Sequence, residues 1–342
     1  MLGRNIRYYR LCSGMSQEEL AAKVGVGKMA ISNYEHDKRV PSMEILKKIA
    51  EALGVSTLSF ISHCDENLSF EHGAFRKKKS TMGLIKQELV REKIERYFSR
   101  FFTLVSILGE SVLPKEPKIE AIPFSDLEEA AQNMRTSLGL PAAGPLGNLV
   151  NHLENKGFLI YIDNFQQDGF YGIHGTVGGR PYLAIRKGMT PERQRFTIVH
   201  ELAHMFFDSK DNLHSENEIN AIAGAFLLPR EDLIRELGPR RTDIRQDLRF
   251  IQQEYGMSMA AIAKRAQQVN IISDEVYRNI MIWLSQMGLR MDEHSGLIVE
   301  KPNLFKQLIC RAVLEDEISM QRAVELSEIP YEQLRALCFG ET

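Results

Sequence analysis

The chain is poor in cysteine and has no long hydrophobic run. Its 342 residues include only four cysteines, at positions 12, 64, 310 and 338, and none belongs to a Cys-x-x-Cys pair. This scarcity argues against a disulfide framework and against a cysteine zinc cluster, so we expect a reducing, cytoplasmic environment. No stretch approaches the roughly 18 uncharged apolar residues of a membrane span, and the start, MLGRNIRYYRLCSG, lacks the apolar core of a signal peptide. Secretion and membrane insertion are therefore not expected.

A strong net charge is also missing. The 43 Lys and Arg are balanced by 45 Asp and Glu, which leaves −2 at pH 7. Averaged over the whole chain, this value argues against a nucleic-acid partner. The charge is unevenly distributed, however, because residues 1–60 hold nine basic and six acidic residues, a net of +3, and the remainder carries −5. With 44% hydrophobic and 26% charged residues, the composition is typical of a folded protein with about two or three domains.

The first sixty residues carry the signals of several short helices. Ser16 and Glu19 form a capping box, which predicts a helix that Gly25 ends. A second short helix is expected over 28–35 and a third over 42–53. Two short helices joined by a tight glycine turn are typical of a helix-turn-helix.

The stretch from Leu11 to Val55 resembles the XRE/Cro-repressor family of DNA-binding domains, through its SQEELA start, glycine turn, ISNYE helix and KRVPS end. The resemblance implies that Gln17 contacts phosphates and that four residues approach the bases of operator DNA: Lys28, Met29, Ser32 and Asn33. Amide, hydroxyl and ammonium groups can pair with base edges, whereas Met29 stands at a usually polar position. Because +3 favours only weak binding by one copy, we expect a homodimer on two half-sites of double-stranded DNA.

The middle of the chain predicts a linker, a long helix and a few strands. Residues 62–80 lack apolar periodicity and include the basic run 76–79, so a linker or loop is expected, with the basic run solvated. Apolar residues at helical spacing predict one long helix over 82–108, and Ser125 with Glu128 resembles a capping box for the next. The pattern then predicts helices over 126–138 and 144–157, strands over 158–162, 171–179 and 181–186, and helices after residue 190. The expected fold class is mainly α with a small β-sheet (α+β).

A second constellation is HELAH, at residues 200–204 of an apolar helical run. His200 and His204 are four residues apart and so share one helix face, with Cβ atoms about 5–6 Å apart, which lets both imidazoles bind one Zn²⁺. Glu201 would then lie beside the metal, placed to take a proton from a water molecule there. A histidine pair buried in a helix core is the structural alternative.

A catalytic zinc site needs a third protein ligand. The metzincin pattern is excluded, because Phe207 and Lys210 stand where its glycine and third histidine belong. The remaining nearby candidates are Asp208, His214, Glu216 and Glu218. Glu216 is best placed, because it opens a predicted apolar helix and can aim its carboxylate inward. Asn220, four residues later on the same face, could hold the second nitrogen of a histidine ligand.

These residues resemble the signature of the ImmA/IrrE metallopeptidase family, H-E-x-x-H followed by E-x-x-A-N-x-F-A-x-x-L-L-x-P. Here the matching segments are HELAH at 200–204 and ENEINAIAGAFLLP at 216–229. The departures exchange one apolar residue for another and fall at Ile219, Ile222 and Phe226. The resemblance implies a gluzincin-like (zincin-like) fold with Glu216 as the third ligand. It also implies that substrate lies against an edge strand at 181–186 by β-addition.

The expected organisation follows from these two resemblances. The predicted domains are a helix-turn-helix domain at 1–61, a linker and long helix at 62–121, a metallopeptidase domain at 122–235 and a helical region at 236–342. The last region suits packing, dimerisation or substrate presentation equally well. No residue is singled out as the oxyanion stabiliser, and the candidates are Tyr171, His174 and Tyr182.

The predicted function has two parts, operator binding and zinc-dependent endopeptidase activity. Zn²⁺ held by His200, His204 and Glu216 would activate the water and the scissile carbonyl, and Glu201 would carry the proton to the leaving amine. The family suggests a protein substrate such as a cognate repressor. The alternative is a non-enzymatic transcription factor or antitoxin, whose peptidase-like domain senses a ligand or binds a partner such as a toxin.

Overall fold

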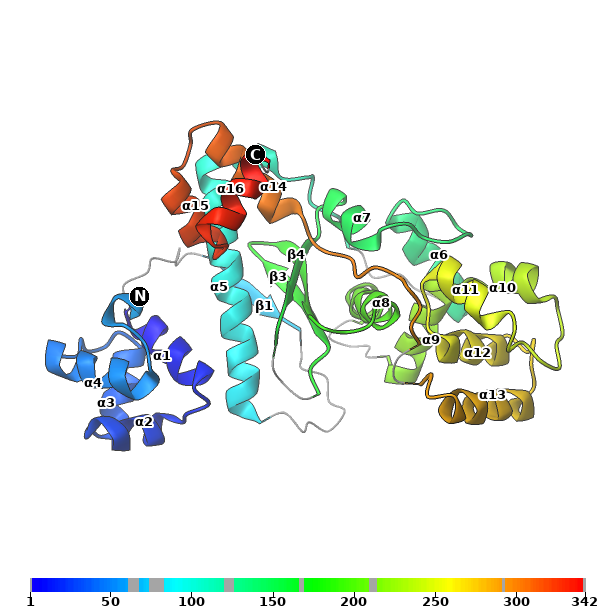
Figure 1. The fold of residues 1–342 in the computed structure, drawn as a ribbon, viewed down its shortest axis with the longest axis horizontal. Helices are drawn as coiled ribbons and strands as arrows, with labels where there is room; N and C mark the ends of the chain where they lie inside the picture. The colour runs from blue at the N-terminus through cyan, green and yellow to red at the C-terminus, as the bar shows by residue number, and fades with distance from the viewer. Residues whose placement is uncertain are drawn as a thin grey trace.

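The computed structural model of the chain describes residues 2–60, 68–73, 83–119, 126–165, 169–208, 214–290 and 293–340. Helices dominate these residues, and one small sheet lies near the middle of the molecule (Figure 1). The expected fold class, mainly α with a small β-sheet, is confirmed. None of the described helices combines the length and apolar character that spanning a bilayer requires.

The N-terminal residues form a bundle of short helices, as predicted. The elements are α1 (Leu2–Cys12), α2 (Gln17–Val24), α3 (Lys28–Glu35), α4 (Met43–Leu53) and the short 3-10 helix η1 (Thr57–Phe60). Ser16 caps α2 in a complete capping box with Glu19. Gly25 and Gly54 end α2 and α4 in the left-handed region, with φ of 77° and 68°, which favours glycine. Apolar side chains such as Ile31 fill the core between the helices.

The described strands form a single sheet in the order β1-β3-β4-β2. They are β1 (Phe70–His72), β2 (Leu159–Asp163), β3 (Gly172–Val177) and β4 (Arg180–Arg186). β4 pairs with β2 in parallel and with β3 in antiparallel orientation, and β1 adds to the other side of β3, also antiparallel. Residues 181–186 therefore belong to a central strand. The expectation that they form a substrate-binding edge was wrong, because both of their sides are already paired.

Helices cover both faces of this sheet (Figure 1). On one face, residues such as Leu159, Tyr182 and Ala184 pack with α5 (Leu84–Leu108) and the C-terminal helices in one core. Those helices are α14 (Leu304–Leu314), α15 (Met320–Ser327) and α16 (Tyr331–Phe339). The alternate residues of the same strands, including Leu183 and Ile185, point into a second core on the other face.

The second core is built by the remaining helices. They are α6 (Leu127–Ser137), α7 (Leu149–Asn155), α8 (Pro191–Phe207), α9 (Glu216–Leu227), α10 (Arg230–Leu237), α11 (Leu248–Tyr255), α12 (Met259–Gln268) and α13 (Asp274–Gln286). Each helix from α6 to α13 contributes buried residues to this core. α8 lies inside it, between the sheet and the outer helices (Figure 1). The domain boundaries stay a prediction.

Some local predictions differ from the structure. Three residues of the expected loop 62–80 form β1, because they find a partner in β3, about a hundred residues away. The rest of that stretch that is described, residues 68, 69 and 73, flanks the strand, and the basic run 76–79 lies outside the described residues. Asp126 caps α6 by accepting from the amide of Glu128, whereas Ser125 lies outside the described residues. Within 144–157, only the part from Leu149 to Asn155 is helical.

A segment without regular secondary structure, residues 293–303, interrupts the helical C-terminal part and contacts α8. Its buried Glu300 accepts from the amide of Val150 at 2.7 Å and forms an ion pair with Arg195 of α8. Gln194 of α8 exchanges hydrogen bonds with the backbone of Glu300, at 2.9 and 3.0 Å. The segment therefore links α8, which carries the HELAH residues, to α7.

The Glu300→Ala variant should lose about 3 kcal/mol of unfolding free energy, because it leaves the buried Arg195 guanidinium without its carboxylate. Urea denaturation followed by circular dichroism measures this change. The matched control is Glu315→Ala, which breaks an exposed pair with Arg311 and should leave stability nearly unchanged. A loss in Glu300→Ala no larger than that of the control would contradict the assigned role.

Candidate functional site

Two helix starts place the candidate metal ligands. Thr190 caps α8 and Pro191 occupies its first turn, so the HELAH residues fall in the last two turns of a well-defined helix. α9 begins at Glu216, immediately after Ser215, which forms a capping box with Glu218. Glu218 is thereby used in the cap, and Glu216 projects from the first turn of α9 towards α8.

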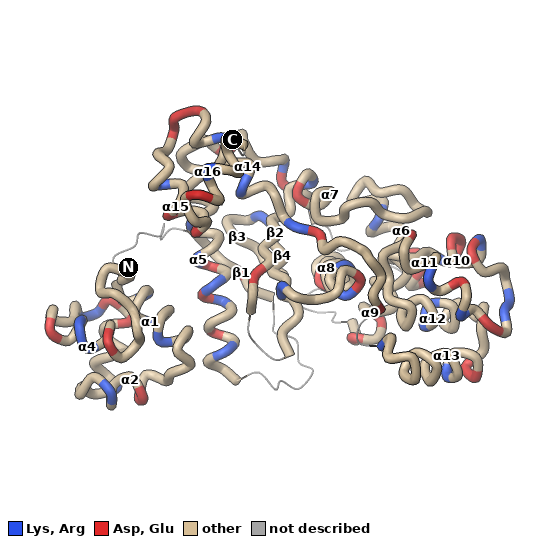
Figure 2. The backbone as a smooth tube through the Cα atoms, in the orientation of Figure 1, with Lys and Arg blue, Asp and Glu red and all other residues tan. Residues whose placement is uncertain are grey.

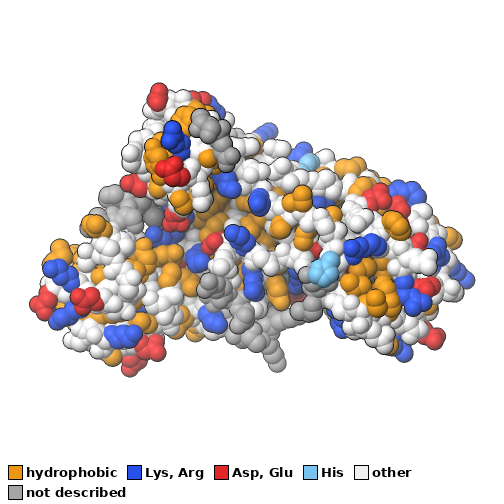
Figure 3. Space-filling model, viewed as in Figure 1, with side chains coloured by type: hydrophobic (Ala, Val, Ile, Leu, Met, Phe, Trp, Pro, Cys, Tyr) orange, Lys and Arg blue, Asp and Glu red, His pale blue; other side chains and the backbone are white. Residues whose placement is uncertain are grey.

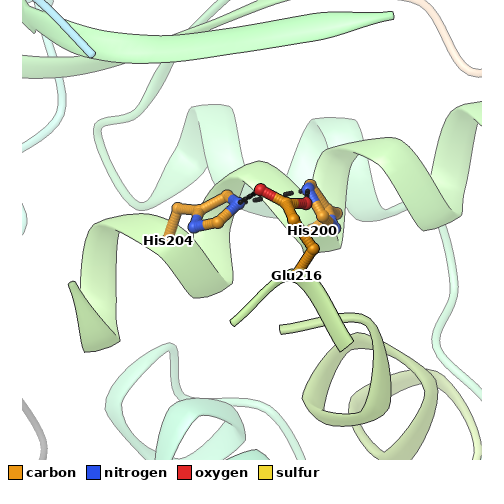
Figure 4. A group of neighbouring side chains, drawn as sticks. All are labelled: His200, His204 and Glu216. Atoms are coloured by element: carbon orange, nitrogen blue, oxygen red, sulfur yellow. Dashed lines mark hydrogen bonds and ion pairs between the residues drawn. The ribbon is translucent and has the colours of Figure 1, made fainter. Parts of the chain in front are cut away.

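The side chains of His200, His204 and Glu216 converge (Figure 4). Nε2 of His200 lies 3.4 Å from Oε2 of Glu216, and Nε2 of His204 lies 3.8 Å from its Oε1. The two Nε2 atoms are 3.1 Å apart. Tetrahedral ligands held about 2.0–2.1 Å from Zn²⁺ are about 3.3 Å from one another, so the spacing of these atoms fits one zinc ion.

Both imidazoles are oriented by an oxygen atom behind them. Nδ1 of His200 donates to Oδ1 of Asn220 at 3.1 Å, and Nδ1 of His204 donates to Oδ2 of Asp208 at 2.6 Å. Each ring therefore presents the lone pair of its Nε2 to the common point. Burial, together with the neighbouring His200, lowers the pKa of His204, which favours the neutral, metal-binding form. The other oxygen of Asp208 accepts from the backbone amide of His214.

Glu201 lies beside this group and is held by a residue of the sheet. Nδ1 of His174, in β3, donates to Oε2 of Glu201 at 2.9 Å, and the His174 ring stacks on that of His204. Burial acts to raise the pKa of Glu201, but the hydrogen bond from His174 and the electrostatic attraction of that ring outweigh it and lower the pKa. Glu201 is thus held ionised, as a proton acceptor must be.

The three oxyanion candidates differ in position. His174 lies against Glu201, as described above. The buried hydroxyl of Tyr182 is hydrogen-bonded to Nδ1 of His72, 2.6 Å away, on the far side of the sheet from the candidate metal ligands. Tyr171 is 45% exposed and its ring lies under the guanidinium of Arg193. Of these candidates, His174 is the one that the structure brings into contact with Glu201.

Sequence reasoning missed two of these contacts. The pattern indicates Asp208 only as a possible ligand, but a carboxylate four residues after His204, at the C-cap of α8, can reach the Nδ1 of that histidine. The contact between His174 and Glu201 joins a strand to a helix across 27 residues, and no local pattern indicates it.

The candidate DNA-contacting residues lie around α2 and α3. Met29 is 74% exposed, and Lys28 is also exposed, with Glu18 3.7 Å away. Ser32 and Asn33, on the same short helix, are half-buried. The side chain of Gln17 is held in place by Glu35, because its amide donates to Oε2 of Glu35 at 2.7 Å. The Glu35 carboxylate is buried and bound by both Nε and an Nη atom of Arg10.

The first turns of α5 lie next to this face. Ile85 and Glu88 of α5 line a cleft together with Gln17 and Lys28. Charged residues of both signs follow one another along α5 (Figure 2). On the face seen in Figure 3, basic side chains are spread over the whole length of the molecule rather than gathered on the N-terminal bundle, in keeping with its modest net charge.

Comparison with known families agrees with both halves of the molecule. Residues 6–60 match a helix-turn-helix family, and residues 153–267 match the family described as IrrE N-terminal-like domain, a peptidase family. The second match contains every candidate residue of the metal centre. The fold and the site therefore define a protein that joins a helix-turn-helix domain to a peptidase-like domain.

The relatives are helix-turn-helix transcriptional regulators. SinR of Bacillus licheniformis is 37% identical over 67 residues, 19% of this chain and 60% of that protein. The regulator y4dJ of Sinorhizobium fredii is 33% identical over 66 residues, 19% of this chain and 86% of that protein. ImmR of Bacillus subtilis is 38% identical over 56 residues, 16% of this chain and 44% of that protein. The chain thus spans less than two thirds of SinR and of ImmR. It belongs to the XRE-type helix-turn-helix regulators, and its residues 153–267 are similar to the IrrE N-terminal-like domain.

Proposed function

We propose that this protein binds operator DNA and cleaves a regulatory protein, such as a cognate repressor, as a zinc-dependent endopeptidase. The observation that carries the peptidase half is the convergence of His200, His204 and Glu216, with the ionised Glu201 beside them. A histidine pair buried only for packing would need neither a carboxylate from another helix nor separate acceptors for both Nδ1 atoms.

The donor set suits Zn²⁺, with two neutral imidazoles and one carboxylate as the ligands. When bound, zinc supplies a Lewis acid for the scissile carbonyl and makes water more acidic. Glu201 takes the proton of the attacking water. Because its Oε2 is bound by His174, Oε1 is the oxygen that accepts the proton and passes it to the leaving amine.

In the N-terminal half, the proposed DNA contacts are Gln17, Lys28, Met29, Ser32 and Asn33. Gln17 is fixed by Glu35 before any DNA arrives, so little side-chain entropy is lost when its amide meets a phosphate. One copy has a small positive charge and so binds DNA weakly, whereas two copies on two half-sites would bind more tightly. We therefore propose a cytoplasmic homodimer.

Asp208→Ala is expected to weaken zinc binding by about 10–100-fold, because it removes the acceptor that orients His204. Competition with a chromophoric zinc chelator measures the affinity without any need for activity. Asp243→Ala is the control, because Asp243 is exposed and its carboxylate pairs with Arg245, two residues away. Equal zinc affinity in the two variants would contradict the role of Asp208.

The proposal is tested by metal analysis of the purified chain and by cleavage assays on the regulatory proteins encoded next to it. Stoichiometric zinc and a substrate cut at one site support it. A protein that binds operator tightly but takes up no zinc would overturn the peptidase half and leave the non-enzymatic alternative, a regulator or antitoxin that uses the domain to bind a ligand or partner.

A further inference from the structure

β1 is an edge strand of the sheet, and it extends towards Glu201. β1 pairs with β3 in the register Phe70 opposite Val177 and His72 opposite Gly175. The next amide, that of Gly73, donates to the carbonyl oxygen of His174 at 2.8 Å. His174 is the residue that holds Glu201. β1 therefore runs along β3 (Figure 1), and the hydrogen bond that follows its last residue is made to His174, the partner of Glu201.

Two glycines make this close fit possible. A Cβ at residue 73 would stand 2.8 Å from the carbonyl oxygen and 2.9 Å from Nε2 of His174. A Cβ at residue 175 would stand 2.3 Å from the carbonyl oxygen of Glu71. Both distances are too short for any side chain, so the contact depends on glycine at both positions. The strands are fitted to each other closely at the end nearest Glu201.

The same edge is where an extended peptide would add to the sheet. A peptide bound by β-addition needs a strand with an open side near the catalytic group. β4 is central, and β3 carries His174 and adjoins α8. The position that such a peptide would take beside β3 is the position that β1 occupies.

A chain of polar contacts ties β1 to the helix-turn-helix domain. Nε2 of His72 lies 3.0 Å from Oε1 of Glu95 on α5, and the other oxygen of Glu95 accepts from Arg4 of α1 at 2.6 Å. Arg4 also pairs with the buried Glu92 at 2.8 Å. The guanidinium of Arg96 lies over the ring of Tyr8. Docking of α1 on α5 thus positions the carboxylate that holds His72.

We propose that β1 is an internal occupant of the substrate-binding edge of β3, held there by Arg4 through Glu95 and His72. The inference rests on the proposed peptidase function. Release of α1 from α5 removes the cation from Glu95, frees β1 and opens the edge to a substrate strand. The fit of β1 also defines the substrate class, an extended peptide with glycine opposite His174.

The test compares Arg4→Ala with Arg7→Ala in the full-length, zinc-loaded protein. Arg7 lies on the same helix and pairs with Glu88 of α5 at 3.6 Å, but Glu88 has no described contact with β1. Hydrogen–deuterium exchange of residues 70–73 should be about ten-fold faster in Arg4→Ala, since a charge-assisted contact is lost. It should stay near the wild-type rate in Arg7→Ala. Unchanged exchange in Arg4→Ala, or an equal rise in both variants, would overturn the proposal.

A second variant releases β1 from β3 and leaves the contact between α1 and α5 intact. Gly73→Val places a side chain against His174, and we expect faster exchange over 70–73. In the cleavage assay, Arg4→Ala should raise kcat/KM for the protein substrate several-fold. If wild type and Arg4→Ala are both inactive, the proposed peptidase function fails, while the exchange data still show whether Arg4 holds β1. If both cleave equally although β1 is released, the edge is not the substrate site.

Discussion

Glu201→Gln is expected to retain zinc and to lose cleavage of the protein substrate by about 1,000-fold or more. The amide has the shape of the carboxylate but cannot accept the proton of the attacking water. Zinc should remain, because His200, His204 and Glu216 and their partners are untouched. Initial rates by gel densitometry, with zinc quantified in the same samples, measure both effects.

A matched acid-to-amide change serves as the control. Glu231 on α10 is exposed and lies outside the two helices that carry the candidate ligands, so Glu231→Gln should cleave at the wild-type rate. If zinc-loaded Glu201→Gln retained a tenth or more of the wild-type activity, Glu201 would be ruled out as the proton carrier. Loss of zinc from Glu201→Gln would instead mean that the carboxylate is needed to build the site.

The helical part of the fold was predictable because its signals are local. Ser16, Glu19 and Gly25 determine where α2 starts and ends through contacts within a few residues, and the structure has each of these contacts. The sheet was predictable only as separate strands. β1 is three residues long, and its partner lies about a hundred residues away, so nothing in its own sequence distinguishes it from a loop. The central position of β4 likewise depends on which strands reach its two sides.

Some residues of the candidate site could likewise be predicted from local sequence patterns, whereas others depend on the tertiary structure. The spacing of His200 and His204 follows from helix periodicity, and the start of α9 determines the direction of Glu216, so these residues could be grouped from sequence. The contact of His174 with Glu201 depends on how β3 lies over α8, which requires the tertiary structure. The relation of the site to the helix-turn-helix domain, through Arg4 and His72, also arises only from the packing around α5.

Arg10→Ala should destabilise the N-terminal bundle by about 3–5 kcal/mol and abolish operator binding. Arg10 and Glu35 are both nearly inaccessible to solvent, with side chains 4% and 0% exposed, so loss of one leaves the other buried and unpaired. Hydrogen exchange of residues 17–35 in the full chain reports the opening free energy of this bundle. Fluorescence anisotropy with a labelled operator, selected from random-sequence DNA by the wild-type protein, reports binding. Lys47→Ala, which removes an equal charge at an exposed position, is the control.

A double variant separates stability from contact with DNA. Replacing the pair by apolar residues, as in Arg10→Met with Glu35→Leu, should restore stability to within about 1 kcal/mol of the wild type, because no charge is left unpaired. Gln17, however, loses the acceptor that orients its amide. Affinity for operator should therefore remain about two- to ten-fold below that of the wild type, the worth of one neutral hydrogen bond. Wild-type affinity in a stable double variant would show that Glu35 supports the bundle alone and that the orientation of Gln17 does not contribute to binding.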